Sequence, residues 1–315
     1  MKVYYSVEEL PVIKNAVLTL GTYDGVHLGH QKIIEFLVKS AKEMNGETVL
    51  FTLHPHPRVV LYPDDHGMQL IQPIEERIKK LAASGIDHLI LFPFSKEFSR
   101  LTATEFVRDI LVNKIGIKMM TIGYNHHFGR NRQGNLSLLK ELGDVYDFKV
   151  QEIPAFKKLD HNVSSTKIRA AITDGDITTA NTYLGSPFEF IGTVVTGDKI
   201  GTGIGYPTAN IEPNSDLQLI PKKGVYAVQV KFGDHVFNGM MNIGTRPTIN
   251  ELGEDRIEIH IFNFDQDIYG ETLNVKVFDR VRDEERFSSL DDLKAQLKKD
   301  EENCIDIFNN LALLK

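Results

Sequence analysis

Cysteine and tryptophan are almost absent from this chain of 315 residues, which has one cysteine, Cys304, and no tryptophan. A single cysteine excludes an internal disulfide, so hydrophobic cores have to stabilise the fold. The cysteine falls in a C-terminal helical pattern, where we expect a buried or partly buried thiol without a catalytic role.

Long apolar runs are missing as well. No stretch reaches the roughly 20 apolar residues that a membrane span needs, and the first ten residues lack the apolar core of a signal peptide. We therefore expect a cytoplasmic protein that has no membrane partner.

Positive charge is also scarce. The chain has 36 Lys and Arg against 43 Asp and Glu, which gives a formal net charge of −7. Broad nucleic-acid binding relies on clustered basic side chains, so this balance argues against it, and any nucleotide is expected to be a small ligand. The length predicts two domains, and the apolar fraction of 42% is that of an ordinary globular protein.

Apolar strand-like runs alternate with helical segments in the first half. This alternation predicts an α/β fold in which crossover helices join parallel strands, with ligands bound at the carboxyl ends of the strands. Pro73 and either Thr102 or Thr104 mark helix starts. The expected strands cover residues 17–20, 48–53, 88–92, 119–123 and 148–153, and the expected helices cover residues 73–84 and 104–114.

The rhythm changes after about Gly185, where strand-like runs follow one another. Turn residues between some of these runs favour antiparallel pairing and a small β-barrel. Leucines at helical spacing from Leu290 predict a terminal helix over one side of that barrel. We therefore expect one domain over residues 1–185 and a second over 186–315, with barrel strands at residues 190–195, 225–232, 236–243, 257–264 and 273–278.

A glycine-rich turn, residues 21–31, lies between the first strong strand-like run and a helical segment. Glycines let the backbone turn sharply, and N–H groups at a helix start favour anionic oxygens. His27 and His30, three residues apart, are expected on one side of the turn, where they could stabilise charge on a transferring phosphate. We interpret the turn as a phosphate site; the alternative is an ordinary surface turn. The further contacts expected there are Gly21, Tyr23, Asp24 and Gly29.

A second cluster begins a later helical stretch at residues 163–169. Hydroxyls, helix N–H groups and an arginine together suit a triphosphate or its departing pyrophosphate. We expect Ser165, Thr166 and Arg169 to contact phosphate and Lys167 to lie on a solvated face. The alternative is that the hydroxyls only cap the helix.

Histidines occur in two further segments of the first half. Residues 54–57 alternate histidine and proline, which fits a rigid turn beside a ligand better than a metal site. In Asn125-His126-His127, neighbouring side chains of a strand point to opposite faces, so at most one histidine should face a pocket.

The second half has its own candidate site. A loop with four glycines in residues 197–205, including Gly197 and Gly205, suits a phosphate. Thr208 and Asn210 follow it and offer oxygen ligands of the kind that Mg²⁺ prefers. The alternative is a loop ending in a turn that Pro207 initiates.

Glu258 is the best candidate for a general base in this half. Its run alternates, so Glu258, His260 and Phe262 share one face of a strand. A carboxylate near phosphate and metal could accept the proton of an attacking hydroxyl, although it could also face solvent on an edge strand. Residues 280–287 are a mixed surface segment unless they close over an aromatic substrate.

Taken together, these motifs resemble the bacterial family of bifunctional riboflavin kinases and FAD synthetases, in the family's order and over nearly the whole chain. The first half resembles its adenylyltransferase module, a Rossmann-like nucleotidyltransferase domain, and the second resembles its flavokinase barrel. The motifs that carry the resemblance lie at residues 21–31, 55–57, 127–134, 164–169, 207–210, 242–248, 258 and 267–270.

The resemblance implies that riboflavin is phosphorylated to FMN in the second half and FMN is adenylylated to FAD in the first, with ATP as co-substrate of both reactions. It implies that Thr208 and Asn210 hold Mg²⁺ and that Glu258 is the base. His27, His30, Ser165 and Arg169 would handle the phosphates of ATP. The flavin contacts implied are His54, Asn125, Arg282 and Glu285.

The sequence departs from the family pattern at three places. Tyr23 stands where the family usually has Phe, Asn125-His126 where it has Asp-Phe, and Thr202 where the kinase loop carries Arg. Two other functions remain as alternatives. One is a transferase for another phosphate ester with a regulatory barrel, and the other is a flavin-binding module without turnover. The sequence leaves the oligomeric state, the rates and the acceptance of flavin analogues open.

Overall fold

Two units divide the chain, and the division is not a single cut. The sheet unit comprises residues 1–68 and 74–164, and the barrel unit comprises residues 69–73 and 165–315. The computed structural model describes residues 1–64, 67–123, 127–154, 157–158, 161–197, 200–245 and 255–313.

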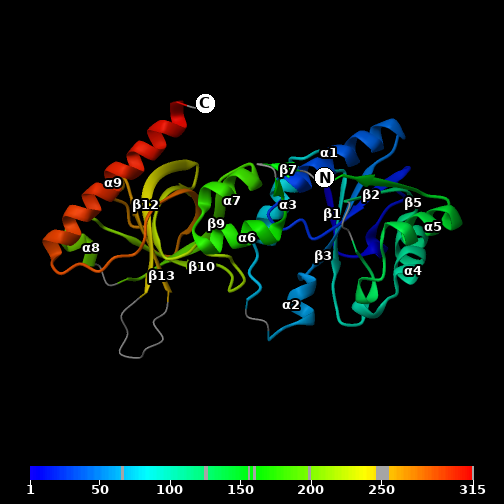
Figure 1. The fold of residues 1–315 in the computed structure, drawn as a ribbon, viewed down its shortest axis with the longest axis horizontal. Helices are drawn as coiled ribbons and strands as arrows, with labels where there is room; N and C mark the ends of the chain where they lie inside the picture. Colours follow the sequence, from blue (N-terminus) through cyan, green and yellow to red (C-terminus); the bar gives the residue numbers. More distant parts are fainter. Residues whose placement is uncertain are drawn as a thin grey trace. The chain divides into compact units, whose positions relative to one another are not determined.

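The sheet unit contains a six-stranded sheet in which every neighbouring pair is parallel. Its strand order is β1-β4-β3-β2-β5-β6, and all five strands expected from the sequence are present. Figure 1 labels four strands of this sheet, β1, β2, β3 and β5. The additional strand β1 has only three residues, too few for an apolar pattern to predict it. The strands are β1 (Lys2–Tyr4), β2 (Ala16–Leu20), β3 (Thr48–His54), β4 (His88–Pro93), β5 (Ile117–Gly123) and β6 (Lys149–Ile153).

Helices cover both faces of this sheet because successive residues of a strand point to opposite sides. Leu50 of β3 packs in one core with α1 (Leu28–Glu43) and α3 (Ile74–Ala82). The next residue, Phe51, packs in a second core with η3 (Phe106–Ile115), and its ring centroid lies 5.6 Å from that of Phe106. The remaining helices of the unit include α2 (Pro57–Leu61), α4 (Ala103–Glu105) and α5 (Leu136–Tyr146).

The sequence left two candidate residues, Thr102 and Thr104, for the start of one helix, and hydrogen bonds decide between them. The Thr102 side chain accepts from the Glu105 backbone N–H, and the Glu105 carboxylate accepts from the Thr102 backbone N–H. This reciprocal capping makes Thr102, rather than Thr104, the residue before the first helical turn.

The barrel unit contains a closed barrel in which every neighbouring pair is antiparallel. The five expected strands are present, and β10 is an additional one that closes the barrel between β9 and β13. Its residues were interpreted only as a turn with metal ligands, because Pro207 and the glycines before it dominate the local pattern. The strands are β9 (Phe188–Val195), β10 (Ala209–Pro213), β11 (Gly224–Phe232), β12 (His235–Thr245), β13 (Asp255–Ile261) and β14 (Thr272–Arg282).

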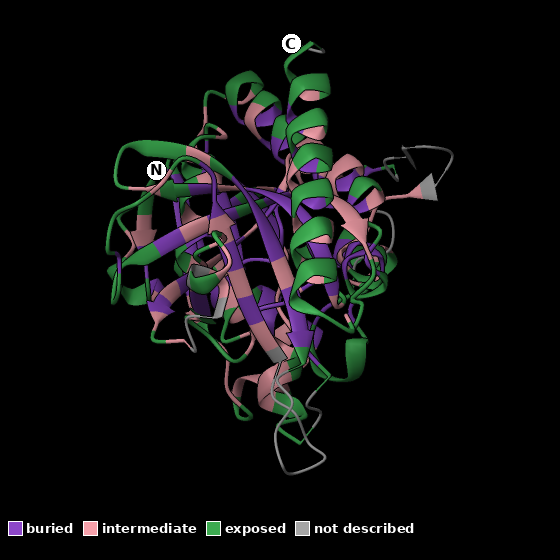
Figure 2. Cartoon of the chain, turned by 90° about the vertical axis from the view of Figure 1, so that its left-hand side faces the viewer, coloured by how far each residue is buried: buried purple, intermediate pink, exposed green. Residues whose placement is uncertain are grey.

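The terminal helix α9 (Leu290–Leu313) covers one outer face of the barrel, as the leucine spacing predicted. Cys304 and Phe308 of α9 pack with Ala227 and Met240 of the strands. The Cys304 side chain is fully buried, and burial, with the nearby Asp300 carboxylate, raises its thiol pKa to about 12. Figure 2 shows the solvent side of α9 as exposed and the strands beside it as buried.

Helices α6 (Ser165–Asp174) and α7 (Ile177–Leu184) belong to the barrel unit. The Asn181 side chain donates to the carbonyls of Val277 and Phe278 in β14 at 3.0 and 3.1 Å, and it accepts from the Phe188 N–H at 2.7 Å. The short segment 69–73 joins the same unit, because Leu70 exchanges backbone hydrogen bonds with Leu217 and Leu219. The boundary expected after residue 185 therefore differs from the boundary of the compact units, and as a boundary of activity it stays a prediction.

Candidate active sites

The glycine-rich turn joins the end of β2 to the start of α1. His27 is the residue before the first helical turn, and its Nδ1 accepts from the His30 backbone N–H at 3.2 Å. The two imidazole rings stack with their centroids 3.6 Å apart and an interplanar angle of 14°. The spacing of three thus places the two imidazoles together, as expected from the sequence, at a helix N-terminus that favours anions.

Buried contacts with β2 and α3 hold this turn in place. The Asp24 carboxylate is fully buried and forms an ion pair of 3.1 Å with Arg77 of α3, which also donates to the Thr22 carbonyl at 3.0 Å. The Tyr23 hydroxyl lies 2.7 Å from the Thr19 hydroxyl, and burial raises the pKa of this tyrosine. Tyr23 and Asp24 were expected at the phosphate, and in the structure Thr19 of β2 and Arg77 of α3 engage their side chains.

The glycines of the turn make room for rings. A Cβ on Gly21 would lie 2.9 Å from Cε2 of Tyr23, and one on Gly29 would lie 3.1 Å from Cε1 of His27. Gly25 has a φ of 84°, which strongly favours glycine. These contacts explain the three glycines through packing and backbone conformation, and direct phosphate contact by Gly21 and Gly29 stays a prediction.

His54 ends β3 at the same carboxyl edge of the sheet. Burial, together with the positive charge of Arg77, lowers the pKa of its imidazole, which favours the neutral ring. His56 acts as the N-cap of the short helix α2, with its Nδ1 accepting from the Arg58 N–H at 3.2 Å, so it has the structural role expected of a rigid turn. Asn125 and His126 lie outside the described residues.

The second phosphate cluster lies at the start of α6, in the barrel unit. Arg169 donates from Nε to the Gln69 carbonyl at 2.8 Å, and so it ties segment 69–73 to α6. Thr166 and Lys167 are exposed, and Ser165 is half-buried. The residues predicted to handle ATP phosphates are thus divided between the two units, with His27 and His30 in one and Ser165, Thr166 and Arg169 in the other.

The candidate site of the barrel begins with a row of three polar residues on adjacent strands. Asn210 of β10 lies directly opposite Glu258 of β13, which lies directly opposite Asn242 of β12. Directly opposed residues share a face of the sheet. His260, two residues after Glu258, lies opposite Met240, which packs under α9. The row therefore faces outward, on the side of the barrel that α9 partly covers.

Arg256 connects two members of this row. Its Nε donates to Asn210 Oδ1 and lies 3.3 Å from Glu258 Oε1. Gly197 lies against the same group, since a Cβ there would fall 1.9 Å from Asn210 Nδ2 and 2.6 Å from Arg256 Nη2. Arg256 was not expected in this site from the sequence, although the strand alternation that places Glu258 and His260 on one face also places Arg256 there.

Residues of β13 and α9 hold the turn before β10. His260 Nδ1 lies 2.8 Å from the Pro207 carbonyl, and the Tyr206 hydroxyl donates to Glu301 of α9 at 3.3 Å. Thr208 is half-buried in this turn, and Gly205 has a φ of 89°. The strand β13 and the helix α9 therefore hold the two predicted metal ligands in place. Thr202 belongs to α8 (Ile200–Gly203), and its side chain lies outside the described part of the chain.

Arg282 is engaged by α9. Its guanidinium donates to both carboxylate oxygens of the fully buried Asp300, at distances of 2.7–3.0 Å, and to the Asp283 carbonyl at 2.9 Å. Its guanidinium carbon also lies 5.6 Å from the ring centroid of Phe287. Glu285 is exposed. Flavin contacts of Arg282 and Glu285 stay predictions; the structure adds that Arg282 anchors the segment that follows β14.

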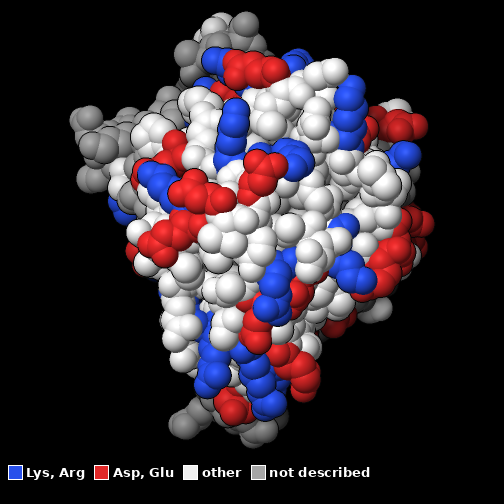
Figure 3. Space-filling model, turned by 90° about the vertical axis from the view of Figure 1, so that its right-hand side faces the viewer, with Lys and Arg blue, Asp and Glu red and all other residues white. Residues whose placement is uncertain are grey.

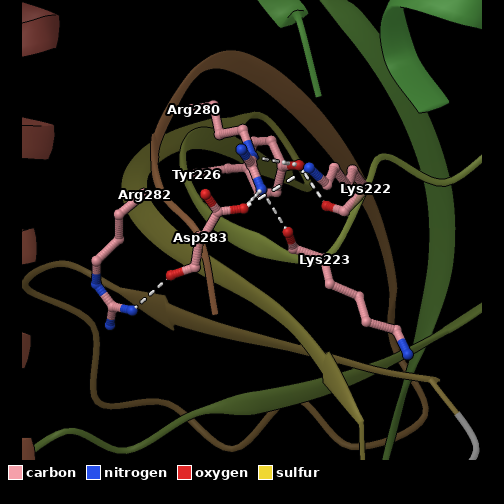
Figure 4. A network of polar contacts seen from close by, with 6 residues as sticks. All are labelled: Lys222, Lys223, Tyr226, Arg280, Arg282 and Asp283. Carbon is pink, nitrogen blue, oxygen red and sulfur yellow. Dashed lines mark hydrogen bonds and ion pairs between the residues drawn. The ribbon is translucent and has the colours of Figure 1, made fainter. Parts of the chain in front are cut away.

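A neighbouring network holds the start of this segment (Figure 4). Arg280 donates from Nη2 to the Lys223 carbonyl at 2.6 Å and to the Asp283 carboxylate at 2.7 Å. It also donates from Nε to the Tyr226 hydroxyl at 3.2 Å, and that hydroxyl in turn donates to the Lys222 carbonyl. The Arg280 guanidinium holds the pKa of the Asp283 carboxyl below its usual value.

Comparison with known proteins matches each half of the chain to a protein family. Residues 10–167 match the family model described as FAD synthetase, and residues 184–308 match the one described as riboflavin kinase. A bifunctional riboflavin kinase/FMN adenylyltransferase of Buchnera aphidicola subsp. Schizaphis graminum is 38% identical and covers 98% of this chain and 99% of its own length. The chain belongs to the family of bifunctional riboflavin kinase/FMN adenylyltransferases.

Two further matches also cover nearly the whole chain. The protein of that name from Escherichia coli K12 is 35% identical over 94% of this chain and 93% of its own. A crystal structure from Streptococcus pneumoniae, named a macrolide-efflux protein, is 34% identical with a TM-score of 0.86 and covers 96% of this chain and 97% of that one. The expectation of this family from the sequence motifs is confirmed.

Two further findings concern partners. Within the described residues, none of the helices combines the length and the apolar character that crossing a membrane requires. On the face drawn in Figure 3, basic and acidic side chains lie intermixed.

Proposed function

We propose that this chain makes FAD from riboflavin in two steps, phosphorylating riboflavin to FMN at the barrel unit and adenylylating FMN at the glycine-rich turn. The observation that carries the proposal is the outward row of Asn210, Glu258 and Asn242, which lies in the half that matches riboflavin kinases. The half that carries the stacked His27 and His30 matches FAD synthetases.

In the first step Glu258 acts as the general base. The ribityl hydroxyl of riboflavin forms a bond to the γ-phosphorus of ATP while the bond to the β-phosphate oxygen breaks, and Glu258 accepts the hydroxyl proton. Glu258 is suited to this role because an amide lies opposite it on each of the two neighbouring strands and its carboxylate is partly exposed.

Thr208 and Asn210 would hold Mg²⁺ in this step. The residues fit the ion: a hydroxyl and an amide oxygen are hard donors, and Asn210 Oδ1 already accepts from a cationic group, the Arg256 guanidinium. Among the residues described, no three His, Cys, Asp or Glu side chains form a metal cluster, so the phosphates of ATP would supply the remaining oxygens. When bound, Mg²⁺ neutralises charge on the transferring phosphate.

In the second step a phosphate oxygen of FMN bonds to the α-phosphorus of ATP, and pyrophosphate leaves. His27, His30 and the α1 N-terminus stabilise the developing charge, while Ser165, Thr166 and Arg169 bind the departing pyrophosphate. FMN would contact His54, held neutral by burial and by Arg77, and Asn125. The expectations of a cytoplasmic enzyme without nucleic-acid or membrane partners are part of this proposal.

One chromatographic time course tests the proposal. The purified chain, supplied with riboflavin, ATP and Mg²⁺, should accumulate FMN first and FAD afterwards, with ADP and pyrophosphate as co-products. FAD formed from supplied FMN, without any FMN made from riboflavin, would favour a transferase with a regulatory barrel. Flavin binding without ADP or pyrophosphate release would favour a storage function.

A further inference from the structure

The guanidinium of Arg256 lies where the proposed metal ligand and the proposed base meet. It donates to Asn210 Oδ1, the oxygen assigned to Mg²⁺, and lies 3.3 Å from the Glu258 carboxylate. The side chains of Arg256 and Glu258 are 24% and 29% exposed, so this ion pair is within reach of solvent and ligands.

A guanidinium and Mg²⁺ compete for the same amide oxygen. Two cations that share one ligand atom are only a few ångströms apart, and their repulsion is strong in a partly desolvated site. Mg²⁺ also requires close octahedral geometry and gives up its waters reluctantly. Arg256 therefore has to leave Asn210 before Mg²⁺ can bind there.

Resting on the proposed role of Thr208 and Asn210, we propose that Arg256 is the internal counter-cation of the kinase site. Before ATP binds, it holds Asn210 and Glu258 in register and keeps the bare metal ion out. The phosphates of ATP carry enough negative charge to accept both cations, so Mg²⁺ enters with the nucleotide and Arg256 moves from Asn210 toward the phosphates.

The first glycine of the glycine-rich loop lies directly against this arrangement. A Cβ on Gly197 would lie 1.9 Å from Asn210 Nδ2 and 2.6 Å from Arg256 Nη2, so any side chain there would have to displace both groups. Because Gly197 has no side chain, Asn210 and Arg256 can keep these positions beside each other.

The test measures metal binding without nucleotide and without turnover. Mn²⁺, followed by electron paramagnetic resonance, serves as the probe for the unaltered chain, Arg256→Gln and Arg256→Lys. Arg256→Gln retains a donor to Asn210 but no charge, so its affinity for Mn²⁺ should rise about tenfold or more as the repulsion is lost. Arg256→Lys retains the charge and should bind Mn²⁺ as weakly as the unaltered chain. Circular dichroism confirms that each variant is folded.

The outcomes distinguish a failure of the counter-cation role from a failure of the proposed metal site at Thr208 and Asn210. If Arg256→Gln binds Mn²⁺ no better than the unaltered chain, including no measurable binding by either, the counter-cation role is overturned. An equal gain in Arg256→Lys overturns it as well, because charge would not be the cause. Asn210→Ala, measured with Mn²⁺ and ATP present, tests the metal site itself: unchanged Mn²⁺ binding by that variant would remove the proposed metal ligand, whatever Arg256 does.

Discussion

Glu258 shows how a single residue acquires a role from its cross-strand neighbours. In isolation, a half-buried carboxylate on a strand is an ordinary surface group. Here it lies between Asn210 and Asn242 and beside Arg256, on the outer face of a barrel. The Arg256 guanidinium holds the carboxylate, and an amide lies opposite it on each neighbouring strand, which suits the proposed base of a phosphoryl transfer.

Replacing Glu258 by Gln should therefore separate the two activities. The amide keeps the size of the side chain but cannot accept the ribityl proton, so FMN synthesis should fall by about a hundredfold or more. FAD formation from supplied FMN should survive, because Glu258 is not among the residues assigned to that reaction. Both rates are measured on the same preparation by chromatography. Near-normal riboflavin phosphorylation by a folded Glu258→Gln variant would show that another group is the base.

His30→Ala should have the opposite selectivity. Loss of one positioned donor at a phosphate typically costs about a hundredfold in turnover, so FAD formation should slow far more than FMN formation. His235→Ala is the matched control, because His235 is an exposed histidine of the barrel unit and no role in either reaction is assigned to this residue. Equal loss of both activities would indicate a folding defect, and unchanged FAD synthesis would exclude His30 from the site.

At the scale of secondary-structure elements, long and strongly patterned segments were predictable. The alternation of apolar strands and helices predicted the parallel sheet, and the leucine spacing predicted α9. The strand β10 was missed because Pro207 and the glycine-rich loop dominate its local sequence. The pairing of Arg282 with Asp300 was not predictable either, since the two residues are 18 positions apart and no periodicity links them.

This pairing attaches α9 to the end of β14 through a charged pair. Asp300→Ala would leave the Arg282 guanidinium, only 16% exposed, without its carboxylate. The variant should lose roughly 3 kcal/mol of unfolding free energy, because a mostly buried charge would lack its partner. Urea unfolding followed by circular dichroism measures the change. Glu302→Ala, an exposed position on the same helix, is the control and should change stability little. Equal stability of the two variants would show that α9 does not depend on this ion pair.

At the scale of the whole molecule, the sequence indicated two activities in two halves, and the family matches agree with that order. It could not indicate where the compact units divide. The helices α6 and α7 carry a helical pattern that suits either neighbour, and only tertiary contacts, such as those of Asn181 with β14, place them in the barrel unit. The division of the predicted phosphate residues between the units was hidden for the same reason.

Fragments test whether the activities separate. A fragment of residues 186–315 should make FMN but no FAD, as expected from the change of rhythm near Ser186. A fragment of residues 165–315 should do the same with higher thermal stability, because it retains the Asn181 side chain that bonds to β9 and β14. Thermal melts and flavin chromatography compare the two. If both fragments are folded but neither makes FMN while the intact chain makes both products, the activities are not modular.

The short segment 69–73 has a consequence for synthesis on the ribosome. Leu70 is translated almost 150 residues before Leu217 and Leu219, the residues to which its backbone is hydrogen-bonded. The sheet unit can assemble as soon as residue 164 has left the exit tunnel, but it must do so with a loop whose partners do not yet exist. The sheet unit of the nascent chain therefore folds while segment 69–73 still lacks its hydrogen-bond partners. That segment reaches its final position only after the barrel unit has been synthesised. Neither unit is formed by one continuous segment of the chain. Dividing the chain at a single position therefore cannot give two fragments that each contain a whole unit.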